Sequence, residues 1–274
     1  MTINAPAVGV APDAPNSPDL YDWQEIVDEL NRYLRFKATP VGMKMFESKE
    51  EMEAVERIRR PSNQRYALDQ IVAQARWLNF TMGITQDDLV GAQCGAPVGL
   101  APQEPEWRKS TNMSGVWFAT DEDAIDHQAA MDCLPYGRYE ALAVSPLASG
   151  RLDPPDIVLL YGTPGQMIIL INGLQFRGYK KFDFSVVGES ACADSWGRAL
   201  RTGEPSLSIP CFAERRFGGV QDDEMLMAMP PAYLTKAIEG MARLSENGLR
   251  YPIASLGIQA DAAPILARSY GDRF

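Results

Sequence analysis

The long apolar stretch from Ile157 to Leu174 constrains the fold of this chain more than any other segment. The five residues Gly162-Thr163-Pro164-Gly165-Gln166 interrupt it, so the stretch cannot form a single membrane-spanning helix. Thr163 is of a type that caps helices, and Pro164 is of a type that begins them. We therefore expect a strand over Asp156–Tyr161 that leads through a tight turn into a helix over Pro164–Phe176.

The segments around this unit alternate between the two kinds of secondary structure. Short apolar runs predict further strands over Pro40–Phe46, Tyr139–Leu147, Lys181–Val187, Ser206–Pro210 and Met225–Pro230. The spacing of apolar residues predicts further helices over Leu20–Phe36, Ser48–Arg60, Asp69–Met82, Ala119–Ala130, Asp194–Thr202 and Ala232–Glu246. This mixture indicates an α+β protein.

We expect one compact α+β domain over residues 20–255, between a flexible N-terminal arm at 1–19 and an irregular C-terminal tail at 256–274. With 274 residues and 46% hydrophobic content, the chain has enough apolar surface for such a core. The arm has neither a basic start nor a continuous apolar run, so it does not resemble a secretory signal. These features predict a cytoplasmic protein that does not bind membranes.

The charge of the chain argues against nucleic acid as a partner. The formal net charge is -10, whereas nucleic-acid-binding proteins usually carry a basic surface. Two short basic runs, Arg57 to Arg60 and Arg215-Arg216, could meet a small anion or could form surface ion pairs. The ligand class that we expect is therefore a small anionic molecule.

Four cysteines, Cys94, Cys133, Cys192 and Cys211, carry the main indication of function. Their long spacings and the absence of CxxC do not fit a disulfide scaffold, a zinc ribbon or a bacterial ferredoxin. Small residues, Pro or cations flank Cys94, Cys192 and Cys211, so folding could bring these three sulfurs to one pocket. Three thiolates suit an iron–sulfur cluster such as [4Fe-4S], with zinc as an alternative. The other readings are a catalytic or redox thiol, and structural cysteines that bind no cofactor.

Lys44 and Glu189 are candidate catalytic residues. Lys44 is the single lysine of an apolar strand, and it must find a partner, face a cavity or face water at a sheet edge. In a site, it would bind a carboxylate. Glu189 lies shortly before Cys192 and could act as a general acid or base, or could be a solvated surface carboxylate.

Arg215 is the third candidate catalytic residue. It follows Cys211 closely and could lower the pKa of that thiol or clamp an anion; the alternative is an ion pair with Asp222, Asp223 or Glu224. His127 is the only histidine of the chain. It falls on a polar helix face, so we expect it at the surface rather than beside a nucleophile.

Several short segments resemble a known family. They are Pro40-Val41-Gly42-Met43-Lys44, Cys94 followed by Gly99-Leu100, Ala143-Val144-Ser145-Pro146-Leu147, Pro155-Asp156-Ile157-Val158-Leu159-Leu160, Cys192-Ala193 and Leu207-Ser208-Ile209-Pro210-Cys211. Over roughly residues 38–255, the chain is similar to the domain of unknown function 169 (DUF169) family. In that family Gly-Asp-Arg often follows the last cysteine, whereas this chain has Ala213-Glu214-Arg215, so only the arginine is retained. The resemblance implies where a site lies and does not imply a reaction.

Taken together, these features predict a cysteine-lined pocket that holds an iron–sulfur cluster. Redox or lyase chemistry on a small anionic metabolite would take place there, in a homo-oligomer or beside a partner subunit of an enzyme. The alternative is a non-enzymatic module that binds or senses a small molecule, or an accessory subunit of a larger enzyme. That alternative is supported by the lack of a recognisable set of acid, base and nucleophile.

Overall fold

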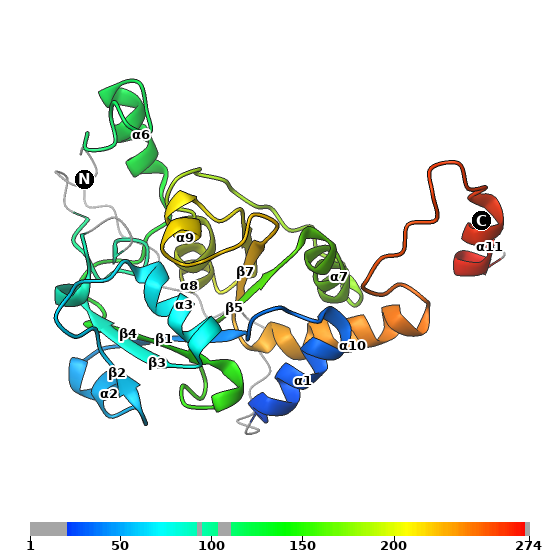
Figure 1. Cartoon of the computed structure of the whole chain (residues 1–274), viewed down its shortest axis with the longest axis horizontal. Coiled ribbons are helices and arrows are strands. Elements are labelled where there is room, and N and C mark those ends of the chain that lie inside the picture. Colours follow the sequence, from blue (N-terminus) through cyan, green and yellow to red (C-terminus); the bar gives the residue numbers. More distant parts are fainter. Residues whose placement is uncertain (1–20, 92–94, 104–110, 272–274) are drawn as a thin grey trace.

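A computed structural model describes residues 21–91, 95–103 and 111–271 of the chain. Its centre is a seven-stranded sheet with the strand order β2-β3-β4-β1-β5-β7-β6 (Figure 1). Strands β2 and β3 are parallel, and the other neighbouring pairs are antiparallel. Helices cover the sheet, so the prediction of a compact α+β domain is confirmed.

The strands differ greatly in length. They are β1 (Val41–Phe46), β2 (Ile58–Arg59), β3 (Thr81–Thr85), β4 (Ala141–Pro146), β5 (Ile157–Gly162), β6 (Ser206–Ser208) and β7 (Met225–Met229). In the middle of the sheet, Met43 of β1 pairs with Val144 of β4 on one side and with Ile157 of β5 on the other. The two shortest strands, β2 and β6, form the two edges of the sheet.

Helices lie on both faces of the sheet. The helices of the described residues are α1 (Trp23–Leu34), α2 (Lys49–Glu53), α3 (Leu68–Leu78), α6 (Asp121–Ala130), α7 (Pro164–Gln175), α8 (Arg198–Thr202), α9 (Phe212–Arg216), α10 (Ala232–Glu246) and α11 (Ala263–Tyr270). Helices α1, α7 and α10 share one hydrophobic core, and α3 and α8 share the other. Figure 1 shows α3 and α10 on opposite sides of the sheet.

Strand β5 contributes to both cores because successive side chains of a strand point to opposite faces. Ile157, Leu159 and Tyr161 pack on the α3 side, whereas Val158 and Leu160 pack on the α7 side. A strand that is buried on both faces reads as a continuous apolar run. This explains why the segment from Ile157 to Tyr161 contains no charged residue.

Helix α7 begins as the sequence predicts. Thr163 is its N-cap, the Thr163 hydroxyl accepts a hydrogen bond from the Gln166 backbone N–H at 3.4 Å, and Pro164 is the first helical residue. The helix crosses α10 closely at Gly173 and Gly240. A Cβ atom on Gly240 would collide with the Gly173 carbonyl oxygen, and one on Gly173 would lie 2.7 Å from the Ala237 carbonyl oxygen. The two helices can therefore approach this closely only because neither Gly173 nor Gly240 has a side chain.

Three predicted elements differ from the structure. The helix predicted over Ser48–Arg60 ends at Glu53 with Ala54 as its C-cap, and Arg57 adopts a left-handed backbone conformation (φ 57°) before β2. The helix predicted over Asp69–Met82 ends at Leu78, because Asn79 forms a left-handed cap (φ 56°). The next residues form β3, a strand that the sequence reading missed. The segment 181–187 is an extended loop and not a strand; its Val187 N–H donates to the Asp194 carboxylate at 2.7 Å.

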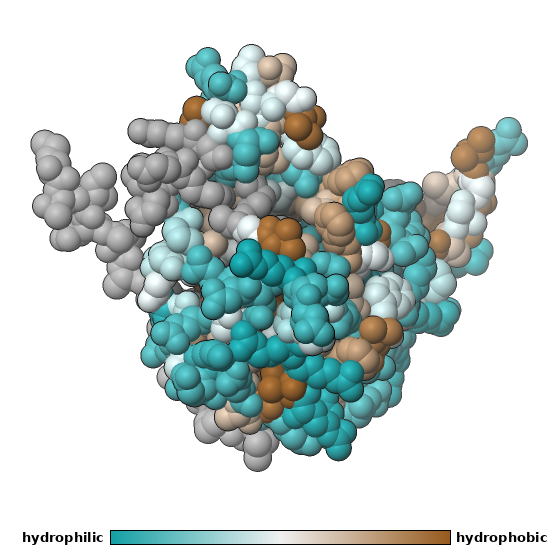
Figure 2. All heavy atoms as spheres, turned by 60° about the vertical axis from the view of Figure 1, so that its left-hand side comes forward, coloured by the Kyte–Doolittle hydropathy of each residue, from teal (hydrophilic) through white to brown (hydrophobic). Residues whose placement is uncertain are grey.

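The end of the chain extends away from the domain. Figure 1 shows α11 apart from the sheet and joined to α10 by an extended segment. The tail is therefore not irregular throughout, because it contains this eight-residue helix. Among the described residues, no helix combines the length and the apolar character needed to cross a membrane. On the face shown in Figure 2, hydrophilic residues predominate and hydrophobic residues form small separate spots.

Candidate functional site

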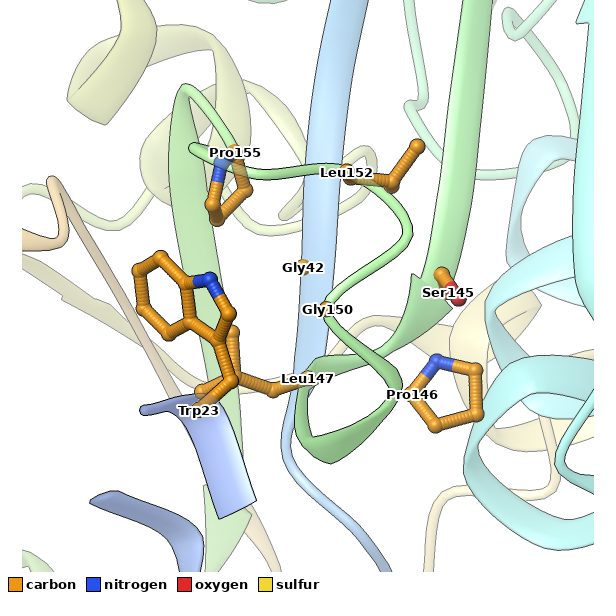
Figure 3. A pocket seen from close by; sticks show the side chains of 8 residues that line it. All are labelled: Trp23, Gly42, Ser145, Pro146, Leu147, Gly150, Leu152 and Pro155. Carbon is orange, nitrogen blue, oxygen red and sulfur yellow. The ribbon is translucent and has the colours of Figure 1, made fainter. Parts of the chain in front are cut away.

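A small pocket lies where α1 meets the loop after β4 (Figure 3). Its volume of ≈ 10 Å³ is room for about one water molecule. The indole of Trp23 points into it, and the Trp23 Nε1–H donates to Asp153 Oδ1 at 3.0 Å. A Cβ atom on Gly42, opposite the indole, would lie 3.2 Å from Pro155 Cβ. The pocket therefore anchors α1 on the sheet and is too small for a metabolite.

A larger open cleft of ≈ 400 Å³ lies beside β3, between Lys49, Arg60 and Tyr139. Its Arg60 guanidinium is held by Glu53 at 2.8 Å and by Asp88 at 2.6 Å. The charge of this arginine is thus neutralised within the protein. The cleft offers a polar surface, and burial raises the pKa of the Tyr139 hydroxyl that lines it, so this group is protonated near neutral pH.

The more informative site is a group of charged side chains buried beneath α3 and α9, which we call the buried polar cluster. It consists of Asp69, Arg76, Glu214, Glu224 and the thiol of Cys211. Asp69 and Arg76 are seven residues apart on α3, which is two helical turns, so they project from the same side of the helix. Asp69 is 2% exposed, Arg76 3% and Glu214 1%. Charged residues are almost never buried to this extent without full pairing.

The contacts of the cluster fix part of each side chain. Glu214 Oε2 accepts a hydrogen bond from the Cys211 backbone N–H at 3.1 Å, which caps the first turn of α9. Arg76 Nη2 donates to Glu224 Oε1 at 2.8 Å. The Arg76 guanidinium also lies 3.8 Å from the centre of the Tyr161 ring, a cation–π contact. Helices α3 and α9 and strand β5 thus hold the cluster in place.

Five buried polar atoms of the cluster have no hydrogen-bond partner among the described residues. They are Asp69 Oδ1 and Oδ2, Glu214 Oε1, and Arg76 Nε and Nη1. Buried polar groups in folded proteins are nearly always satisfied, because leaving one unpaired costs about 1–3 kcal/mol. So many unpaired atoms in one place indicate a site that receives protons, water or a ligand.

The electrostatics of the cluster favour protonated acids. Burial and the nearby charge of Glu189 raise the pKa of Asp69 to about 7. Burial and the charge of Asp69 raise the pKa of Glu214 to about 8. Burial, followed by the charge of Glu214, raises the pKa of the Cys211 thiol above its usual value. Near neutral pH, these pKa values favour the protonated form of the two acids, and Cys211 remains a thiol.

Glu189 lies next to this cluster, as its effect on Asp69 shows. Its Oε2 accepts a hydrogen bond from the Phe212 N–H at 3.4 Å, at the start of α9. Its backbone carbonyl lies 2.8 Å from His127 Nε2. His127 is buried and packs on the Phe118 ring at 4.9 Å, so the prediction of a surface histidine is wrong. Phe118 precedes Thr120, the N-cap of α6, so the pattern of this helix does not predict the contact with His127.

The backbone around Cys192 has an unusual conformation. Ser190 is left-handed (φ 65°), and a π-helical turn spans Ala193–Gly197. A Cβ atom on Gly197 would lie 2.5 Å from the Asp132 carbonyl oxygen, so the turn needs a glycine there. Both features are enriched at functional sites. In the sequence, Cys192 follows Glu189 by three residues.

The structure describes two of the three cysteines of the predicted site. Cys94 lies outside the described residues. Cys192 and Cys211 are both buried thiols, and Cys192 packs in the core with Trp196. Over the described ranges, no group of three His, Cys, Asp or Glu side chains is placed to hold a metal ion. The convergence of the three cysteines therefore stays a prediction.

Lys44 lies apart from the buried polar cluster. Lys44 alternates along β1 with Val41, Met43 and Met45, whose side chains pack on the α3 side, so Lys44 lies on the opposite face of the sheet from Asp69. Its Nζ is 3.5 Å from the Asp153 carbonyl oxygen, and β1 is a central strand rather than an edge.

Arg215 lies beside the cluster but is largely occupied by its own loop. Its Nε donates to the Pro210 carbonyl at 3.1 Å and its Nη1 donates to the Gln221 carbonyl at 2.5 Å. A further contact to Asp222 is long, at 3.8 Å, and Asp222 is fully exposed. Arg215 therefore braces the loop after α9, and its charge lowers the pKa of Glu214.

The sequence reading missed Asp69 and Arg76, although a signal was present. Both interrupt the apolar face of α3 that Ile71, Val72 and Ala75 form, and a charged residue in an apolar stripe is buried when the helix packs. Glu214 was not predicted as a site residue, because this chain has Ala213-Glu214-Arg215 where the family pattern has Gly-Asp-Arg. Its burial depends on the packing of α9 against α3, which the sequence does not reveal.

A mixed sheet that carries helices on both faces defines an α+β protein, and in this one ionisable side chains are buried beneath one helical layer. Within that class, the chain belongs to the DUF169 family, described as "Uncharacterised ArCR", whose model matches residues 29–240.

A curated relative is known from Methanocaldococcus jannaschii, "Uncharacterized protein MJ0308". It is 26% identical over 125 residues, which cover 44% of this chain and 52% of that protein. The chain thus matches about half the length of this relative. No solved structure is significantly similar.

Proposed function

We propose that the protein is an enzyme that binds a small molecule at the buried polar cluster and transfers protons to or from it. Asp69 and Glu214 would act as the acid–base pair. The observation that carries this proposal is the burial of both carboxyl groups with unpartnered oxygens, Oδ1 and Oδ2 of Asp69 and Oε1 of Glu214. Two interacting carboxyl groups with pKa values near neutrality are typical of acid–base catalysis.

The surroundings suggest different roles for the two acids. Glu214 is oriented by the Cys211 N–H, so one of its oxygens is fixed and the other is available to a ligand. Asp69 has no fixed oxygen and is the better candidate for the group that exchanges its proton with the ligand. Glu189 raises the pKa of Asp69 by its charge and acts as a positioning residue for α9.

The state of the two acids can be tested before a substrate is known. We expect infrared difference spectra between about pH 5 and about pH 9 to show a protonated carboxyl band that titrates near neutrality. The Asp69→Asn and Glu214→Gln variants should each lose part of that band. Glu246→Gln, an exposed change on α10, should leave it unchanged.

A measurement of substrate turnover distinguishes an enzyme from a binding module. Incubation with a metabolite extract, followed by mass spectrometry, should show a substrate consumed by the wild type and not by Asp69→Asn. Ligand binding without consumption would favour the non-enzymatic binding or sensing module, or the accessory subunit. A wild type with both acids ionised at about pH 5 would refute the acid–base pair.

An iron–sulfur cluster held by Cys94, Cys192 and Cys211 is a second proposal, with redox or lyase chemistry on a small anionic metabolite. The position of Cys211 within the buried polar cluster supports it, because a cofactor there would adjoin the two acids. Three carboxylates near Cys211 disfavour a thiolate, so a cationic metal centre would have to offset their charge.

Anaerobic purification tests this second proposal. We expect a broad visible absorption and matching iron and sulfide contents, both lost in Cys192→Ser and Cys211→Ser and retained in Cys133→Ser. Iron-free wild type with full turnover would exclude the cluster and leave the acid–base proposal intact.

A further inference from the structure

We propose that Arg76 anchors a carboxylate group of the ligand, and that the ligand binds together with a proton. This inference rests on the proposed function, because it names the ligand class of the same site. It also replaces Lys44 and Arg215 with a buried arginine as the group that meets the anion.

The Arg76 guanidinium is held rigidly but is not saturated. Nη2 donates to Glu224 Oε1 at 2.8 Å, and Glu224 Oε2 is itself fixed by the Gln221 N–H at 2.9 Å. The Tyr161 ring covers one flat face of the guanidinium at 3.8 Å. A guanidinium donates only in its plane, and Nε and Nη1 have no hydrogen-bond acceptor there among the described residues.

The charge around Arg76 restricts the anion to a small one. Glu224 already offsets the positive charge of Arg76, and the other groups that face the cluster are acidic or neutral: Asp69 on α3, Cys211 and Glu214 on α9, Glu189 and Tyr161. Arg215 is the other nearby cation, and its N–H groups serve backbone carbonyls. A phosphate dianion would meet too little positive charge here, whereas a monocarboxylate could be accepted.

Protons complete the charge balance. When Asp69 is protonated, its hydroxyl group can donate to an oxygen of a carboxylate that Arg76 holds. A bound anion also raises the pKa of Asp69 further, because it opposes the ionisation of this acid. Binding therefore takes up a proton, and the affinity decreases as the pH rises through about 7, where Asp69 ionises.

Acetate is the probe, and inorganic phosphate is the comparison. We expect acetate to shift the Arg Nε–H resonance of Arg76 in nuclear magnetic resonance spectra of the wild type, and phosphate to have a much smaller effect. Calorimetry in two buffers with different ionisation enthalpies should show proton uptake on acetate binding. Both measurements use the unmodified protein and do not depend on any variant folding.

Variants then assign the effect. Arg76→Met should weaken acetate binding at least about tenfold, while Arg201→Met, an exposed arginine paired with Asp132 at 2.6 Å, should not. Asp69→Asn should retain acetate binding and lose much of its pH dependence. Because these readouts need no turnover, acetate binding with inactive chemistry would refute the acid–base function and leave the anchor standing. No acetate binding to the wild type, binding without proton uptake, or equal affinity in Arg76→Met would overturn the inference.

Discussion

At the scale of single residues, the molecule carries a cost that its fold alone does not require. Replacing the polar side chains of a buried cluster by apolar ones of similar shape is often neutral or stabilising. Asp69, Arg76 and Glu214 nevertheless remain charged or ionisable in the interior, with unpartnered atoms. Functional sites commonly lower the free energy of unfolding of the protein that contains them.

This cost has a direct consequence for the pH dependence of stability. An unfolded aspartate or glutamate has a pKa near 4, whereas in the folded protein the pKa of Asp69 is about 7 and that of Glu214 about 8. Between these values the folded state holds more protons than the unfolded state. The free energy of unfolding should therefore decrease as the pH rises from about 5 to about 8, and should level off above that.

Urea unfolding at several pH values checks this expectation. Each pKa unit corresponds to about 1.4 kcal/mol, so the decrease should reach several kcal/mol. Asp69→Asn and Glu214→Gln should each flatten the curve, whereas Glu246→Gln should not. A wild type whose stability rises over the same interval would show that the two acids are ionised and paired in the folded state.

At the scale of elements, the sequence predicted those whose ends carry a chemical signal. Helix α7 begins at Thr163-Pro164 as expected, and β5 precedes it. Strand β3 was missed because α3 ends at Asn79, and an asparagine cap is a weaker stop signal than glycine. The burial of Glu214 depends on contacts between α9 and α3, which are distant in the sequence. No pattern along the chain therefore predicts it.

The crossing of α7 and α10 gives a prediction at this scale. Gly240→Ala should push the helices apart, because its Cβ would meet the Gly173 carbonyl, and should lower the free energy of unfolding by about 1–3 kcal/mol. Thr235→Ala lies on the exposed side of the same helix and should change it by less than about 0.5 kcal/mol. Chemical denaturation of the two variants measures both values. Equal stabilities would mean that the helices do not cross at these glycines.

At the scale of the whole molecule, the α+β class and the single domain followed from the alternation of apolar runs. The placement of the site did not, because α3, β5, α9 and the segment around Glu189 come from distant parts of the chain. Sequence reasoning identified Glu189 and Cys211 one by one. Only the folded arrangement shows that they adjoin Asp69, Glu214 and Arg76.

The two ends of the sheet have a further consequence. The outermost strands, β2 and β6, contain two and three residues, so each exposes only a short row of unpaired backbone amides and carbonyls. A long bare border would act as a template on which a strand from another molecule could add. The brevity of these borders therefore protects the protein against strand-by-strand growth into fibres, even though the strands between them are strongly apolar.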